Sequence, residues 1–465
     1  MMPLSCQSTA KAIPDPFAPC TMHFLALDIG SSFIKGAVLD AEKLTIEHVT
    51  RVPFPEPIAG LPPGYFEVDP GLVMGAVKKV LENLLVQAPT AAGVQFSSQM
   101  GGVIVVDSSG KPLTNYISWR DQRTTEQSAR GESYLAGIRD WLGEDGLLNM
   151  GSELRAGSPL AILHWLQNQG RLEPEGMALS LGDFVLAELC NAKVSIVDRT
   201  LALGLLNLPR NDWHYYAWAS FGLDDLNWPN LGNAWNVAGN WKVNGREIPC
   251  YPPIGDHQAA LAGALIQSGE LSLNISTGSQ ISLLTDEFVP GNFQSRPYLD
   301  GRFLNTITHL PAGRSLDVLV NLVGKSWSEI AAAAEGASDT YLAANLTFFE
   351  GPLGSRGSIS NITTENLSVG TLFRAAFRNM AENYATCAAR LSPEKNWNRI
   401  VFSGGLAQKL PLLRQFILEK LPGESRLCSS AEDTLLGLLV ISQVISGRAK
   451  NLREASRLVS AAQRG

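Results

Sequence analysis

The feature that most constrains the fold is a strand–turn–strand unit that occurs twice, far apart in the chain. Residues 24–40 form one apolar unit around Gly30-Ser31-Ser32, and residues 271–284 form another around Thr277-Gly278-Ser279. Aliphatic and β-branched runs joined by so short a turn are typical of antiparallel strands. Because the repeat distance is long, the pattern predicts two similar α/β domains and argues against a solenoid.

The expected domain boundary lies near Pro252-Pro253. We expect residues 1–21, which are broken by prolines, to be a disordered leader, residues 22–251 to form an N-terminal domain, and residues 252–465 to form a C-terminal domain. The apolar period predicts a helix over Pro70–Gln87 with Asp69 as its N-cap. Other expected elements are a strand at 45–54, a strand at 94–97, a strand at 103–107, a strand at 400–402, and helices at 374–391, 410–420 and 432–444.

Charge and cysteine usage exclude several classes of protein. The net charge of −7 makes a nucleic-acid partner unexpected. No apolar run reaches the ~18–20 residues that a membrane span requires, so no membrane partner is expected. The six cysteines are scattered without a C-x-x-C pair, which indicates reduced thiols in a cytoplasmic protein and not a zinc site.

Three turns combine glycine with hydroxyl side chains at strand ends: Gly30-Ser31-Ser32, Thr277-Gly278-Ser279 and Ser403-Gly404-Gly405. Such hairpin turns direct backbone N–H groups and hydroxyls at one point and can bind a phosphate. Each could also be an ordinary tight turn. Gly324-Lys325-Ser326 is not a phosphate loop of the Walker A type, because Leu319 stands where that motif needs a glycine.

Two charged residues flank the first turn. Asp28 ends an apolar strand, where a carboxylate is costly unless it caps the turn or helps to bind Mg²⁺ beside a phosphate. Lys35 in the next strand could face the phosphates or the solvent.

Asp256 precedes an alanine-rich helical stretch. It could be an ordinary helix N-cap, or it could be the general base that removes a proton from a substrate hydroxyl. His257 is the one histidine of six that adjoins this candidate. Nothing in the sequence has the spacing of a zinc-binding helix.

A third cluster combines directed polar side chains with an aromatic ring. Gln99, Met100 and Gly101 are followed by the segment Trp119-Arg120-Asp121-Gln122-Arg123. This mixture suits a polyhydroxylated ligand, although a buried tryptophan beside a surface ion pair explains the segment equally well.

Taken together, these stretches resemble the FGGY family of carbohydrate kinases, from Phe24 to about Gly447. Each is weak alone, but their order and spacing are specific. The matching stretches are LDIGSSFIKGAVLD, SSQMGGVIVVDSSGKPLTNYISWRDQR, IGDHQAALAGAL, LNISTGSQISLL and FSGGLAQKLPLLRQ.

The resemblance implies two ribonuclease-H-like domains of the actin and sugar-kinase type, with ATP and Mg²⁺ in the cleft between them. It implies that Asp256 is the catalytic base and that Asp28 lies at the metal. The residues implied to contact the nucleotide are Gly30, Ser31, Ser32, Lys35, Thr277, Gly278, Gly313, Gly404 and Gly405. The residues implied to contact the sugar are Gln99, Met100, Gly101, Trp119, Asp121, Arg123 and His257.

Within the family, LNISTGSQ, PYLDGRFLNTITHL and the segment 356–384 are most similar to sedoheptulokinases. This implies transfer of the ATP γ-phosphoryl group to a ketose, sedoheptulose above others, with xylulose or another ketose or polyol as the alternative. Two departures stand out, since many members carry histidine at Gly101 and some carry asparagine at Lys409. They keep open a non-catalytic sugar or nucleotide sensor on the same fold. The expected partners are a small sugar and ATP, and the oligomeric state, with a homodimer as one alternative, stays open.

Overall fold

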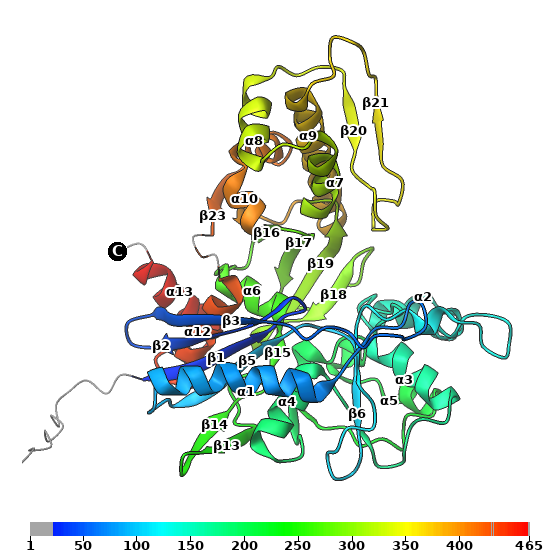
Figure 1. Ribbon diagram of the computed structural model, residues 1–465, viewed down its shortest axis with the longest axis vertical. Coiled ribbons are helices and arrows are strands. Elements are labelled where there is room, and N and C mark those ends of the chain that lie inside the picture. Colours follow the sequence, from blue (N-terminus) through cyan, green and yellow to red (C-terminus); the bar gives the residue numbers. More distant parts are fainter. Residues whose placement is uncertain (1–21, 429, 431, 464–465) are drawn as a thin grey trace, which may run out of the picture.

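The structure, a computed structural model, describes residues 22–428, 430 and 432–463. The expectation of a disordered leader at 1–21 concerns residues outside this set. The described chain contains two large mixed sheets with helices on their faces, one above the other in Figure 1. No described helix is long and apolar enough to cross a membrane.

The first sheet carries the N-terminal strand–turn–strand unit. The central strand β1 is apolar from Phe24 to Leu27 because both of its faces are covered, Leu25 and Leu27 on one side and Phe24 and Ala26 on the other. The order is β13-β14-β5-β1-β2-β3, and β15 also pairs with β5. The strands are β1 (His23–Ile29), β2 (Phe33–Asp40), β3 (Thr45–Pro53), β5 (Gly93–Ser98), β13 (Gly239–Val243), β14 (Arg246–Cys250) and β15 (Ile254–Gly255).

The second sheet repeats this topology. In each sheet a strand pairs antiparallel with the next strand along the chain and parallel with a later one, as β1 does with β2 and β5, and β16 with β17 and β22. The order is β18-β19-β17-β16-β22-β23. The strands are β16 (Glu270–Ile275), β17 (Ser279–Thr285), β18 (Gln294–Pro297), β19 (Phe303–Leu310), β22 (Arg399–Ser403) and β23 (Glu424–Leu427).

Helices cover the outer face of each sheet. Helix α1 (Pro70–Gln87) lies on the first sheet, and the Asp69 carboxylate accepts a hydrogen bond from the Gly71 N–H, so the expected helix and cap are correct. Helix α9 (Val369–Leu391) covers the second sheet, with α11 (Pro411–Lys420) packed against it. The helices are thus on opposite sides of the molecule in Figure 1.

Two helices lie between the sheets. Helices α6 (Asp256–Gly263) and α12 (Asp433–Ile445) cross in direct contact, and α12 also packs on β1, β2, β3 and β5. Their core includes residues of both sheets, such as Ala26 and Val401. Because α6 and α12 touch both halves, their N-termini are held at the line where the halves meet.

The remaining elements are peripheral to this framework. The helices are α2 (Tyr134–Asn149), α3 (Pro159–Asn168), α4 (Leu181–Cys190), α5 (Tyr215–Ser220), α7 (Gly313–Val323), α8 (Trp327–Gly336), α10 (Gly405–Lys409) and α13 (Leu452–Ala462). The short strands are β4 (Glu67–Val68), β6 (Ile104–Val106), β7 (Tyr116–Ile117), β8 (Met177–Leu179), β9 (Ile196–Asp198), β10 (Leu206–Asn207), β11 (Asp212–Trp213), β12 (Asn230–Gly232), β20 (Ala343–Asn345) and β21 (Ser358–Ser360).

Candidate functional site

A cavity of about 390 Å³ lies where the ends of the two sheets meet the N-terminus of α6. Residues of both halves of the chain line it. From the N-terminal half these include Ser31, Gln99, Met100, Gly101, Trp119, Glu153 and Arg155, and from the C-terminal half Asp256, His257, Gln280, Arg296, Thr308, His309 and Thr434. The sequence-predicted candidates Asp256, Gln99, Trp119 and Ser31 are therefore brought together.

Asp256 is the first residue of α6, and the N-cap is Gly255. The N-cap alternative for Asp256 is thus wrong by one position. Its Oδ1 accepts a hydrogen bond from the His257 N–H at 2.8 Å. Burial, and next the charge of Asp28, raise the pKa of Asp256 to about 7. A carboxyl with this pKa in a cavity is well suited to accept a proton near neutral pH.

Asp28 is the penultimate residue of β1 and is buried, and its partner Thr434 lines the same cavity. Its Oδ1 accepts a hydrogen bond from the Ser97 hydroxyl at 2.7 Å, and its Oδ2 accepts one from Thr434 at the start of α12 at 2.8 Å. Asn274, at the equivalent place in the second sheet, donates to Ser403. The repeated unit thus places an acid in one half and a neutral amide in the other.

The Asp28 site fits a divalent cation. Burial raises the pKa of Asp28, and its charge in turn raises that of Asp256, so the two carboxyls concentrate negative charge at one point. A bound Mg²⁺ would offset this charge, and it commonly uses one or two protein carboxylates together with nucleotide phosphates. Asp28, directly or through water, is the residue that would hold it.

The first phosphate turn has the expected hairpin form. The Gly30 N–H donates to the Phe33 carbonyl at 3.0 Å, and Ser31 lines the cavity. Lys35 is tied across the two halves, because its Nζ lies 2.7 Å from the Glu432 carboxylate just before α12. Lys35 therefore forms a partly exposed ion pair across the two halves.

The nucleotide candidates of the C-terminal half converge on the second turn, between β16 and β17. The Gly313 N–H donates to the Ser276 carbonyl at 3.0 Å, and a Cβ at Gly313 would lie 2.7 Å from that oxygen. Thr277 accepts from the Arg314 N–H at 2.8 Å. Gly404, with φ +88°, lies so close to Ile275 that a Cβ would sit 2.5 Å from its carbonyl oxygen.

The third turn differs from the expectation of a hairpin. Residues Ser403-Gly404-Gly405 join strand β22 to helix α10. Gly404 is the N-cap of this helix and has a positive φ, which glycine adopts without strain, and the helix begins at Gly405 beside the end of β16. Gly278 and Gly405 have open space where a Cβ would be. Gly278, Gly313, Gly404 and Gly405 thus lie along one surface at the ends of β16 and β22.

The sugar-side candidates fall into two groups, of which the first lines the cavity. Trp119 donates its Nε1–H to the Gln99 Oε1 at 3.1 Å, and the Gln99 amide donates to the Gly30 carbonyl at 3.4 Å. Gly101 has φ +80°, and a Cβ there would lie 3.0 Å from Trp119. A glycine at this position therefore keeps Trp119 at the cavity wall, which gives the departure at Gly101 a structural reason.

The second group does not reach the cavity. Asp121 and Arg123 are fully buried and bond to each other, and Arg123 also donates to Glu67 at 2.6 Å. The Arg123 guanidinium lies over the rings of Tyr65 and Trp165. The expectation of a surface ion pair is therefore wrong, because this pair is buried. It lies outside the cavity and supports the segment that carries Trp119.

His257 lines the cavity with both ring nitrogens engaged. Its Nδ1 lies 2.9 Å from Arg296 Nη1 and its Nε2 3.3 Å from the Ser282 hydroxyl. Arg296 also bonds to Glu153 at 2.5 Å, which links strand β18 to the N-terminal half. Desolvation lowers the pKa of His257 well below its usual value, so the ring is neutral.

Sequence reasoning missed Glu153, Arg155, Arg296 and His309. Glu153 and Arg155 stand two apart in the loop between α2 and α3, where charged residues in a run of small and apolar ones were the available signal. Arg296 and His309 carry no local pattern. Their position at the cavity follows only from the tertiary structure, in which β18 and β19 pack near that loop.

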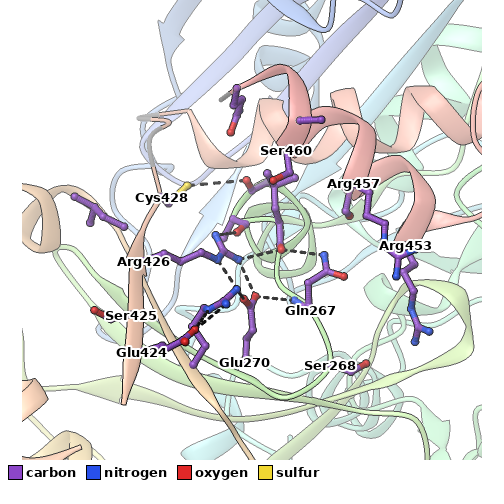
Figure 2. Close-up of a pocket in the computed structure, with 18 residues that line it drawn as sticks. Gln267, Ser268, Glu270, Glu424, Ser425, Arg426, Cys428, Arg453, Arg457 and Ser460 are labelled. Carbon is purple, nitrogen blue, oxygen red and sulfur yellow. Dashed lines mark hydrogen bonds and ion pairs between the residues drawn. The ribbon is translucent and has the colours of Figure 1, made fainter. Parts of the chain in front are cut away.

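A larger pocket of about 1160 Å³ lies apart from this site, between β23, α13 and the C-terminus of α6 (Figure 2). Arg426 there donates to the Glu270 carboxylate at 2.8 Å and to the Ala264 and Leu265 carbonyls. Arg453 and Arg457 project from α13 in the same view. None of the predicted site residues lines this pocket.

Comparison with known proteins identifies relatives of similar sequence. It is 26% identical to "Glycerol kinase 2" of Saccharolobus solfataricus over 302 residues, which is 61% of this chain and 56% of that protein. The match thus spans only about half the length of that relative. Sedoheptulokinase of Mus musculus is 22% identical over 464 residues, covering 86% of this chain and 92% of that protein.

Solved structures share the fold. Plasmodium falciparum glycerol kinase with ADP superposes with a TM-score of 0.83 at 19% identity, covering 94% of this chain and 92% of that one. A ligand-bound xylulose kinase from Lactobacillus acidophilus gives 0.82 at 17% identity, with 94% and 92% covered. These likenesses confirm the expected two-domain architecture.

The sequence model of the FGGY family of carbohydrate kinases, N-terminal domain, matches residues 23–262. That segment contains Asp28, the first turn, Trp119 and Asp256, and it amounts to just over half of the chain. The chain therefore belongs to the FGGY family of carbohydrate kinases.

Proposed function

We propose that the protein is an ATP-dependent kinase that transfers the γ-phosphoryl group to a hydroxyl of a ketose, with sedoheptulose as the favoured acceptor. The observation that carries the proposal is the position of Asp256. This buried carboxyl, with its pKa raised to about 7, opens into the cavity that the phosphate-turn residue Ser31 also lines. A base beside a phosphate turn is what transfer to an alcohol requires.

In the proposed reaction, Asp256 accepts the proton of the attacking hydroxyl while Gln99 and Trp119 position the sugar. The turn that follows Gly30 and the surface at Gly278 and Gly404 hold the ATP phosphates, and the close packing of Gly313 on Ser276 shapes that surface. Mg²⁺ would supply positive charge at the phosphates beside Asp28. The enclosure of the cavity by both halves would limit wasteful transfer to water.

Sedoheptulose is favoured over glycerol by the extent of the similarity. The mouse sedoheptulokinase matches over 92% of its length, whereas the match to the Saccharolobus glycerol kinase covers 56%. The sequence resemblance at 273–280 points the same way. Xylulose is the first alternative to test, since five- and seven-carbon ketoses share the carbonyl end of the molecule.

The test is acceptor-dependent ADP release with Mg-ATP, measured for sedoheptulose, xylulose, ribulose, gluconate and glycerol. We expect turnover with a ketose and a loss of about 10²- to 10⁴-fold in kcat for Asp256→Asn. Full activity of that variant would exclude Asp256 as the base. Activity on gluconate or glycerol alone would exclude the ketose assignment, and ATP turnover unaffected by every sugar would favour a sensor.

A further inference from the structure

Arg155 and His309 meet across the halves of the molecule at the mouth of the cavity. Arg155 Nη1 lies 3.0 Å from His309 Nδ1, and Nη2 lies 3.5 Å from the Thr308 hydroxyl. The three residues line both the 390 Å³ cavity and a neighbouring one of about 950 Å³. The pair thus lies on the boundary between the two cavities.

This contact fixes the tautomer of His309. A guanidinium has only N–H donors, so His309 Nδ1 accepts and the ring proton resides on Nε2. Desolvation, with the charges of Arg155 and Arg296, lowers the pKa of His309 to about 4, and the ring stays neutral at neutral pH. Among the described residues neither His309 Nε2–H nor Arg155 Nε–H donates a hydrogen bond to the protein, and both side chains are exposed at the cavity mouth.

Two neighbouring cavity residues, His257 and Arg296, already make hydrogen bonds within the protein. Both nitrogens of His257 are engaged, and Arg296 is held by Glu153 and His257. Arg155 has no carboxylate within ion-pair distance among the described residues. The mouth of the cavity therefore presents N–H donors without a protein acceptor, and Asp256 lines the same cavity.

We propose that Arg155 and His309 bind the carbonyl oxygen of an open-chain ketose and make the site select a ketose over the corresponding alditol. The inference rests on the proposed kinase function and specifies how its acceptor is recognised. A carbonyl oxygen only accepts hydrogen bonds, so it matches a wall of donors. A hydroxyl in its place also brings a proton, which would face N–H groups and remain unpaired.

The direction of the substrate agrees with this assignment. In a 2-ketose the carbonyl lies one carbon from one end, and the primary hydroxyl at the opposite end is the farthest from it. Because Arg155 and Asp256 line the same cavity, a ketose held by its carbonyl at Arg155 can present that far hydroxyl within the cavity that Asp256 lines. Both ends of the acceptor are thereby held, which orients the attacking oxygen.

The experiment compares kcat/KM for xylulose with that for its reduced forms xylitol and arabinitol, in the wild type, Arg155→Met and Arg155→Lys. In the wild type we expect the ketose to be preferred. In Arg155→Met we expect kcat/KM for xylulose to fall about 10- to 100-fold, mainly through KM, with the alditol values nearly unchanged. Arg155→Lys, which keeps a donor, should retain part of the preference.

The matched control is Arg390→Met, since Arg390 lines only the outer cavity and bonds to Asn292 and the Pro352 carbonyl. It should leave the ketose preference intact. Equal turnover of ketose and alditol by the wild type, or an equal loss for both in Arg155→Met, would overturn this inference but leave the kinase proposal intact. Preference for gluconate over every ketose would assign the donors to a carboxylate and also overturns it.

Failure of the underlying function has a separate signature. A wild-type protein that gives no acceptor-dependent ADP with any compound overturns the kinase proposal and this inference with it. Thermal unfolding of each variant checks that it folds. If Arg155→Met is unfolded, the wild-type ratio and the Arg155→Lys ratio decide the question.

Discussion

At the scale of single residues, the ionisation of Asp256 sets the expected pH dependence. Burial and Asp28 raise its pKa to about 7, so it is mostly protonated below that pH and cannot act as a base. We expect kcat/KM for the acceptor to fall about tenfold per pH unit below pH 7 and to level off above it. Burial is the larger cause of the raised pKa of Asp256. The fall in kcat/KM below pH 7 should therefore persist when a cation offsets the charge of Asp28.

Initial rates of ADP release between pH 5.5 and 9 measure this profile. Thermal unfolding over the same range shows whether any loss reflects denaturation. A profile that is flat down to pH 5.5 would contradict the assignment of Asp256 as a base with a raised pKa.

Gly313 offers a second test at this scale. Gly313→Ala would place a methyl group 2.7 Å from the Ser276 carbonyl oxygen and push the start of α7 away from the second turn. We expect about 1–3 kcal/mol of destabilisation and an increase of about 10- to 100-fold in KM for ATP. Urea unfolding and ATP-dependence kinetics measure the two effects.

The control is Gly336→Ala at the end of α8, where a Cβ meets nothing within 4 Å. It should leave both quantities close to the wild type. An unchanged KM for ATP in Gly313→Ala would mean that the contact with Ser276 does not shape the nucleotide site.

At the scale of elements, the crossing of α6 and α12 depends on glycine. A Cβ at Gly437 would lie 2.0 Å from the Ala259 carbonyl, and one at Gly263 would lie 1.9 Å from the Asp433 carbonyl. Helix α6 begins at Asp256, and the Thr434 hydroxyl near the start of α12 bonds to Asp28. The spacing of the two helices therefore sets the positions of both carboxyls.

Gly437→Ala should force the helices apart. We expect at least about 1–3 kcal/mol of destabilisation, together with a fall in kcat although no polar group of the site is changed. Denaturant unfolding and ADP release measure the two changes, with Gly75→Ala on α1 as a control in open space. Loss of stability with full kcat would show that α6 keeps its place without this contact.

At the scale of the whole molecule, polar contacts join the halves around the cavity. Glu153 and Arg296 are both buried and lie 2.5 Å apart, with Lys35–Glu432 and Asp28–Thr434 on the side toward α12. A buried pair is expensive to break from one side, because the remaining charge has no partner. These contacts hold the halves in the arrangement that closes the cavity.

Glu153→Gln should therefore lower the free energy of unfolding by about 3–5 kcal/mol, since Arg296 is left as a buried cation. The double variant Glu153→Gln/Arg296→Gln should recover part of this loss. Guanidinium unfolding of the two variants and the wild type gives the comparison. A double variant no more stable than Glu153→Gln would mean that the uncompensated charge is not the cause.

The sequence alone determined the repeated framework. The strands at 24–40 and 271–284, the helix at 70–87 and the turns at Gly30 and Thr277 are set by local apolar runs and short polar turns, which act within a few residues. Asp28 and Asp256 could be selected because a carboxylate beside an apolar strand or at the start of a helix is conspicuous, and Trp119 because it is an aromatic ring within a polar segment.

Only the tertiary structure decided which groups face the substrate. It placed Asp121 and Arg123 behind the wall, engaged both nitrogens of His257, and brought Arg155, Arg296 and His309 to the cavity from separate segments. Such contacts depend on how β18 and β19 meet a loop more than 130 positions away along the chain, as the separation of 143 between Glu153 and Arg296 shows. A local pattern carries no information about packing at that distance, so the chemistry of the mouth of the cavity appears only when the halves are assembled.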